Sequence, residues 1–140
     1  MKTKTDLIKD LAFVLEMNGF EHYIDRNSLE LISLPQDKFD DDEYSSKDRM
    51  QIQKNKGNYI QIETFTSSDN FNLMEDFSIG IENIKVKNDL LKALSRKKPF
   101  ANFKETLHSY PDYLEEWYKF KNDFYSQAAE DLLSKLAISI

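Results

Sequence analysis

The amino-acid sequence predicts an α+β fold with an N-terminal helix, a small antiparallel sheet of about three strands, and a C-terminal set of three or four helices. Three observations predict this order. Apolar residues recur at helical spacing near the N-terminus. Short runs rich in aromatic and branched residues follow, bounded by turn residues. Helical spacing then returns after about residue 67.

The N-terminal helix is expected over residues 5–18. Four apolar residues fall on one stripe with a 3.6-residue period: Leu7, Leu11, Val14 and Leu15. Thr5 is the expected N-cap. Gly19 tolerates a positive φ and is expected to end the helix.

A hairpin and a third strand are expected next. The runs 20–24 and 29–34 flank the turn sequence Asp-Arg-Asn-Ser, and Pro35 stops the second strand. Residues 59–63 alternate strictly between two faces, which is typical of a half-buried strand. The three runs predict one small antiparallel sheet.

The segment 36–58 has no clear period and is expected to be a mobile surface loop. Between residues 37 and 48 it holds six acids against two lysines: Asp37, Asp40, Asp41, Asp42, Glu43 and Asp48. A calcium loop needs ligands at alternating positions and a glycine for its sharp turn, and this run has neither. We therefore expect a solvated loop that binds no metal tightly.

Four helices are expected in the C-terminal half, at about 67–84, 88–94, 99–107 and 112–136. Ser67 or Ser68, Asn88, Pro99 and Pro111 are the expected start signals. The expected buried stripe of the last helix is Leu114, Trp117, Phe124, Ala128, Leu132 and Leu136. Phe103 and Trp117 are expected to share one core, whereas Tyr118 and Tyr125 lie off the stripe and are expected at the surface.

Composition limits the classes of function. The 140 residues predict one domain, 1–140, and the absence of cysteine excludes disulfides and metal–thiolate sites. No apolar run is long enough for a membrane span, and charged residues interrupt any signal-peptide core, so a cytoplasmic protein is expected. The two histidines, His22 and His108, lie in no catalytic signature, and three glycines form no nucleotide fingerprint. We therefore expect neither an enzyme nor a cofactor.

The segment 85–104 is the best functional lead. It holds six lysines and one arginine against one aspartate, net +6, within a chain of net −6. Clustered cations attract phosphates or acidic partners. The residues expected to contact an anionic partner are Arg96, Lys97, Lys98 and Lys104. The alternative is a solvated helix face that only balances the acidic segment.

Several short motifs occur in a fixed order and carry a family resemblance: Asn70-Phe71-x-Leu73-Met74-x-Asp76-Phe77, Leu90-Leu91-x-Ala93-Leu94, Pro99-Phe100-x-x-Phe103-Lys104, Tyr110-Pro111 and Trp117-Tyr118-x-Phe120. This order resembles a widespread, uncharacterised conserved bacterial family. The hairpin, acidic segment and third strand match it more loosely, so the resemblance covers nearly the whole chain. It implies a fold plan and no catalytic residue. The family usually has a glycine before the Phe-x-x-Phe-Lys element, whereas here residues 95–98 are Ser-Arg-Lys-Lys, which leaves the turn geometry open.

The expected function is that of a small, non-enzymatic binding or regulatory module whose partner is a protein. The alternative is a nucleic-acid-associated protein that uses the basic segment, and an enzyme is the third choice. Salt distinguishes the first two, because phosphate binding weakens steeply with ionic strength whereas an apolar protein interface does not. The sequence leaves the oligomeric state open.

Overall fold

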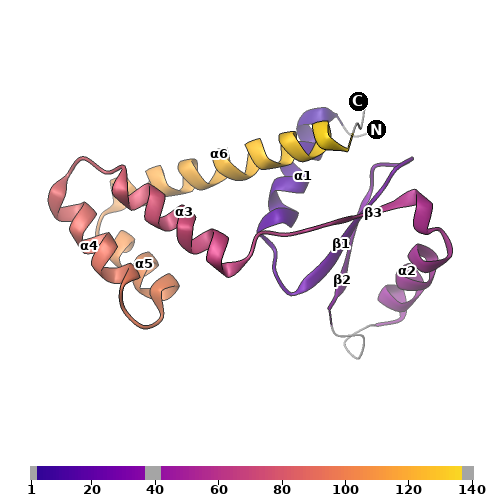
Figure 1. Cartoon of the computed structure of the whole chain (residues 1–140), viewed down its shortest axis with the longest axis horizontal. Helices are drawn as coiled ribbons and strands as arrows, with labels where there is room; N and C mark the ends of the chain where they lie inside the picture. Colours follow the sequence, from indigo (N-terminus) through magenta and orange to yellow (C-terminus); the bar gives the residue numbers. More distant parts are fainter. Residues whose placement is uncertain (1–2, 37–41, 137–140) are drawn as a thin grey trace. The chain divides into compact units, whose positions relative to one another are not determined.

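The computed structural model describes residues 3–36 and 42–136, and it confirms the α+β prediction (Figure 1). The elements in order are α1 (Lys4–Glu16), β1 (Phe20–Asp25), β2 (Leu31–Pro35), α2 (Glu43–Lys54), a 3-10 turn η2 (Lys56–Asn58), β3 (Tyr59–Ile62), α3 (Ser67–Ile79), α4 (Ile84–Leu94), α5 (Pro99–His108) and α6 (Pro111–Lys135). These elements form two compact units. The sheet unit comprises the described residues up to Phe65 together with those from Tyr125 onward, and the helical unit is Thr66–Phe124. The expectation of one domain over 1–140 stays a prediction.

The sheet has the strand order β2-β1-β3, and both pairs are antiparallel. The predicted turn of the hairpin is present: the Asp25 carboxylate accepts from the backbone N–H groups of Asn27 and Ser28, at 2.8 and 3.1 Å. These two bonds hold the pKa of Asp25 below its ordinary value. The hairpin connection therefore follows from the turn residues that the sequence places there.

His22 is buried in the central strand β1 and has a partner at each ring nitrogen. Nε2 lies 3.0 Å from the carbonyl oxygen of Met17, just after α1, and Nδ1 lies 2.6 Å from Oγ of Ser33 on β2. A carbonyl only accepts, so Nε2 carries the proton, and in the neutral ring Nδ1 accepts from the Ser33 hydroxyl. The histidine therefore joins the end of α1 to two strands.

Helix α1 begins one residue earlier than expected and ends two residues earlier, at Glu16. Thr3, rather than Thr5, is the N-cap, and it forms a capping box in which its hydroxyl accepts from the Asp6 N–H and the Asp6 carboxylate accepts from the Thr3 N–H. The predicted stripe is confirmed, because the buried residues of α1 are Leu7, Leu11, Val14 and Leu15.

The prediction of a loop over 36–58 is wrong for most of its length, since α2 and η2 occupy residues 43–54 and 56–58. The Asp42 carboxylate caps α2 by accepting from the Ser45 N–H at 2.7 Å. Glu43 pairs with Lys47 one turn later, and Ile52 is the buried apolar residue. Residues 37–41, which hold three of the acids, lie outside the described part of the chain.

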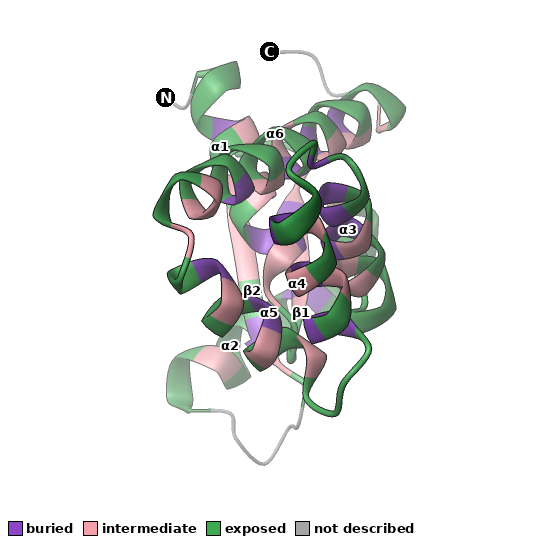
Figure 2. Cartoon of the chain, turned by 90° about the vertical axis from the view of Figure 1, so that its left-hand side faces the viewer, coloured by how far each residue is buried: buried purple, intermediate pink, exposed green. Residues whose placement is uncertain are grey.

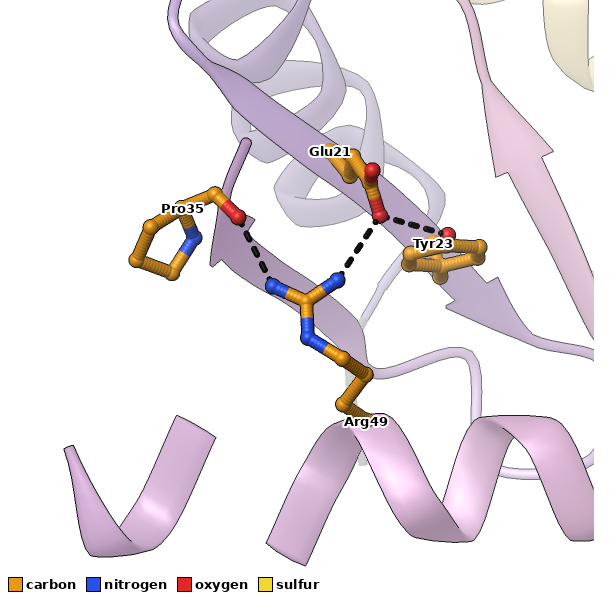
Figure 3. Close-up of polar contacts among 4 residues, drawn as sticks. All are labelled: Glu21, Tyr23, Pro35 and Arg49. Atoms are coloured by element: carbon orange, nitrogen blue, oxygen red, sulfur yellow. Dashed lines mark hydrogen bonds and ion pairs between the residues drawn. The ribbon is translucent and has the colours of Figure 1, made fainter. Parts of the chain in front are cut away.

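Arg49 fixes α2 against the sheet (Figure 3). Its guanidinium donates to Glu21 Oε2 at 3.2 Å and to the Pro35 carbonyl at 2.7 Å. The Tyr23 hydroxyl donates to the same Glu21 oxygen at 3.0 Å. Burial raises the pKa of Tyr23, and the bond to Glu21 raises it further. A charged side chain therefore occupies the position where a helix usually presents an apolar one.

The helical unit is built around a cluster of aromatic rings that pack mostly edge to face, and the buried residues of its helices lie along one side of each (Figure 2). Trp117 lies 5.1 Å from Phe103, 5.3 Å from Phe77 and 6.3 Å from Phe120, measured between ring centroids. Phe103 is fully buried and Trp117 nearly so, which confirms that they share one core. Phe103 and the Trp-x-x-Phe motif therefore supply packing.

Three helix boundaries in this unit differ from the prediction. α3 is capped by Thr66, whose side chain accepts from the Asp69 N–H, and not by Ser67 or Ser68. α3 ends at Ile79 rather than near Ile84, because Gly80 and the residues after it leave the helix. α4 is capped by Asn83, whose side chain accepts from the Val86 N–H at 3.2 Å, and not by Asn88. The predicted starts at Pro99 and Pro111 are confirmed.

The predicted stripe of α6 is wrong beyond Trp117. Phe124 is exposed and Tyr125 is buried, and the buried positions that follow are Ala129 and Leu133. The Tyr125 ring packs edge-on against Phe65, at 5.4 Å between centroids. α6 contributes its first part to the helical unit and its last part to the sheet unit, so each part buries a different side. Within the described residues, no helix combines the length and apolar content that a bilayer span requires.

Candidate functional site

The basic turn, residues Ser95–Lys98, joins α4 to α5 and is exposed throughout (Figure 2). It presents Arg96, Lys97 and Lys98 in succession, and Lys104 is exposed farther along α5. The structure thus brings three of the four predicted site residues into one connection. Lys104 lies one and a half turns into the following helix.

Backbone geometry fixes this turn. Lys98 has φ 56° and ψ 56°, in the left-handed region that a lysine rarely adopts. The Asn102 side chain donates to the Lys97 carbonyl at 2.7 Å, and the Asn102 N–H donates to the Lys98 carbonyl at 3.1 Å. Lys98 therefore adopts the conformation that glycine favours. This answers the question that the missing glycine had left open.

A cleft of about 380 Å³ lies between α4 and α5, beside the basic turn. Its lining residues are Asp89, Lys92, Ala93, Arg96, Asn102, Glu105, Thr106, Ser109 and Tyr110. Of the four predicted residues only Arg96 lines it. Two cations and two carboxylates face the cleft, so their charges balance. The excess positive charge is therefore on the turn itself.

Tyr110 closes one end of this cleft. Its hydroxyl donates to the Asp89 carboxylate on α4 at 2.5 Å. This bond raises the pKa of the Tyr110 phenol above its ordinary value, and desolvation adds to the effect. The Tyr-Pro motif thus has a structural role, because Tyr110 ties α4 to the residue that begins α6.

A second hollow, the acidic groove, lies between the end of α3 and the first turns of α6. It measures about 420 Å³ and is lined by Asp76, Phe77, Gly80, Ile81, Glu82, Tyr113, Glu116 and Phe120. Phe77 and Phe120 lie 5.4 Å apart and contribute apolar surface. No ion pair within the described residues involves the carboxylates of Asp76, Glu82 or Glu116. The groove therefore combines an apolar lining with three uncompensated negative charges.

Sequence reasoning did not find the acidic groove. Its carboxylates come from α3, the α3–α4 connection and α6, which are up to forty residues apart in the chain. The sequence shows the apolar residues Ile79 and Ile84 on either side of the connection, and the structure shows that both are exposed. Single exposed apolar residues are common on protein surfaces, so this pair alone does not identify a groove.

The expectations of no metal site and no catalytic site stay predictions. Both ring nitrogens of His22 form hydrogen bonds within the fold, and His108 is exposed at the end of α5. Of the acidic segment, Asp42 caps a helix and Glu43 pairs with Lys47. Across residues 3–36 and 42–136, no three or more histidines and carboxylates come close enough together to hold a metal ion.

Comparison with known proteins gives a family without an assigned activity. The model of a family described as Uncharacterised protein family (UPF0158) matches residues 2–139. A UPF0158 protein of Pseudomonas aeruginosa is 29% identical over 133 residues, which cover 95% of this chain and 84% of the relative. No solved structure gives a significant match. Because the family model covers nearly the whole chain, this chain belongs to the UPF0158 family, as the C-terminal motifs indicated.

Proposed function

We propose that this protein is a non-enzymatic binding module that captures an acidic protein partner through the basic turn. The observation that carries the proposal is the succession of Arg96, Lys97 and Lys98 on one exposed connection of fixed backbone geometry. An arginine fork can pair with a carboxylate through two parallel bonds, whereas lysines act as point charges.

The anchoring of the turn supports a binding role. Asn102 holds the Lys97 and Lys98 carbonyls, so the backbone is already ordered before a partner arrives. Binding then costs mainly side-chain entropy, because no backbone has to be ordered, so a small surface can bind more tightly than a flexible loop of the same size. A protein partner is favoured over nucleic acid because a protein can present its carboxylates as one small patch that matches the turn. A phosphate backbone carries charge along its whole length, and the rest of a chain with net charge −6 would repel it.

The test compares three forms of the full chain. The turn variant R96E/K97E/K98E reverses the basic turn, and the control K4E/K9E/K56E makes the same change in net charge at exposed residues of the sheet unit. Exposed substitutions usually change stability by less than about 0.5 kcal/mol, so both variants should fold. Binding of a fluorescent poly-glutamate peptide is measured by anisotropy, and proteins captured from nuclease-treated lysate are compared.

The parent and the control should bind the peptide and recover the same proteins, and the turn variant should lose both. Equal binding by the turn variant would refute the proposal. The nucleic-acid alternative predicts a different result: an oligonucleotide would bind the parent more tightly than poly-glutamate does, with the steeper salt dependence of counterion release.

A further inference from the structure

We infer that the acidic groove is a docking site for the basic turn of a second copy of this chain. The inference rests on the proposed function, because it names a partner for the same basic turn. The helical unit carries both complementary surfaces, the basic turn and the acidic groove.

Charge complementarity is the first argument. The groove presents the carboxylates of Asp76, Glu82 and Glu116 without a counter-cation among the described residues. The basic turn presents three cations, and none of them forms an ion pair with another described residue. Three charges of each sign can therefore meet across one contact, which favours encounter and fixes its orientation.

An apolar match is the second argument. Phe100, directly after the basic turn and Pro99, is 39% exposed at the start of α5. The groove offers the rings of Phe77 and Phe120 beside Ile81. An aromatic side chain rimmed by cations thus faces an aromatic lining rimmed by carboxylates, and an apolar anchor within a polar rim is the usual anatomy of a protein interface.

Geometry requires that the contact be between copies. Glu82 of the groove lies just before α4, and Arg96 of the basic turn lies just after it, so the two surfaces are at opposite ends of this helix (Figure 1). α4 has 11 residues, which corresponds to a length of about 16 Å. Both ends belong to one compact unit, so a turn cannot reach its own groove. The contact is head-to-tail, which generates rings or open chains of molecules.

The experiment uses the distinctive property of a head-to-tail contact. Sedimentation is measured for the parent, for the turn variant R96E/K97E/K98E, and for a groove variant, E82K/E116K. The parent should show an average mass that rises above 16.5 kDa with concentration and returns to it with added salt. Each variant alone should remain at 16.5 kDa. For the mixing test the charges are removed rather than reversed, in R96Q/K97Q/K98Q and E82Q/E116Q, because a reversed turn would attract a reversed groove. An equimolar mixture of these two variants retains one intact groove and one intact turn, so it should form a dimer of twice that mass and nothing larger.

Two controls carry matched charge changes away from both surfaces: K4E/K9E/K56E for the turn variant and E63K/E130K for the groove variant. Both should assemble like the parent. If charge reversal unfolds the groove variant by circular dichroism, E82Q/E116Q replaces it, because glutamine keeps the shape and removes the charge.

Three results would overturn the inference: a parent that stays monomeric at every concentration, a folded groove variant that assembles like the parent, or a mixture of the two variants that stays monomeric. The proposed function fails separately, if the turn variant still binds poly-glutamate. If the parent stays monomeric but still needs its basic turn to bind poly-glutamate, the inference of a second copy is wrong and the proposed function stands.

Discussion

Replacing Arg49 with alanine should detach α2 from the sheet. Arg49 is the charged group that joins the helix to both hairpin strands, through Glu21 on β1 and the Pro35 carbonyl on β2. Its side chain is 12% exposed and that of Glu21 is 31% exposed, so the pair is shielded from water on one side only. α2 has 12 residues and one buried apolar side chain, Ile52. A helix this short is marginal in water without tertiary contacts.

The loss in the free energy of unfolding caused by Arg49→Ala follows from how far the Arg49 contacts are buried. Hydrogen bonds to charged groups contribute about 1.5–3 kcal/mol each, whereas an exposed ion pair contributes about 0.2–1 kcal/mol. The Arg49 contacts lie between these cases, and we expect Arg49→Ala to lower the free energy of unfolding by about 2 kcal/mol. The matched control is Lys47→Ala, whose pair with Glu43 is 70% and 79% exposed and whose loss should cost less than about 0.5 kcal/mol.

Urea denaturation gives the free energies, and amide hydrogen exchange shows where the loss occurs. The α2 amides should exchange much faster in Arg49→Ala, while those of α5 in the helical unit should keep the parent rate. If Arg49→Ala and Lys47→Ala have equal effects, or if the α2 amides stay protected, then Ile52 packing alone holds the helix and the reasoning is wrong.

Three further predictions concern the helical unit. Trp117→Ala should cost about 3–5 kcal/mol in urea denaturation, whereas truncation of the exposed Phe124 should cost far less; equal losses would contradict the assigned core. Lys98→Gly should raise the free energy of unfolding by about 1 kcal/mol, since glycine adopts a positive φ without strain, and a lower melting temperature would contradict the strained geometry. The raised pKa of Tyr110 means that its bond to Asp89 stabilises the fold below the ordinary value of 10.0 and is lost as pH rises through the folded-state pKa. In Asp89→Asn, ultraviolet titration should show this phenol returning toward its ordinary value, and an unchanged titration would contradict the contact.

The sequence predicted the elements whose apolar residues keep a regular spacing, and it missed α2, where a polar group occupies the inward position. The stripe of α1 and the alternation of β3 were both identified from apolar spacing. α2 was missed because its inward face is Arg49 and Ile52, which lack an apolar period. A capping aspartate at position 42 was visible, but acids in a charged run are also typical of a loop.

The prediction of which side of α6 is buried was wrong for a different reason. A single stripe assumes one continuous core along the whole helix. Here Trp117 packs against Phe77 and Phe103 in the helical unit, and Tyr125 packs against Phe65 in the sheet unit. The buried side of α6 changes between Trp117 and Tyr125, and no local feature of the sequence marks the residue at which it changes. The basic turn was predictable because contiguous charge needs no tertiary information, whereas the acidic groove depends on the packing of α3 and α6.

The division of α6 between the two units also determines which unit is completed first during translation. The sheet unit is discontinuous in the chain, because the residues from Tyr125 onward belong to it and Tyr125 packs against Phe65, sixty residues earlier. The helical unit is continuous from Thr66 to Phe124. On a translating ribosome the helical unit therefore has all its residues first, and the sheet unit is complete only when the last turns of α6 emerge.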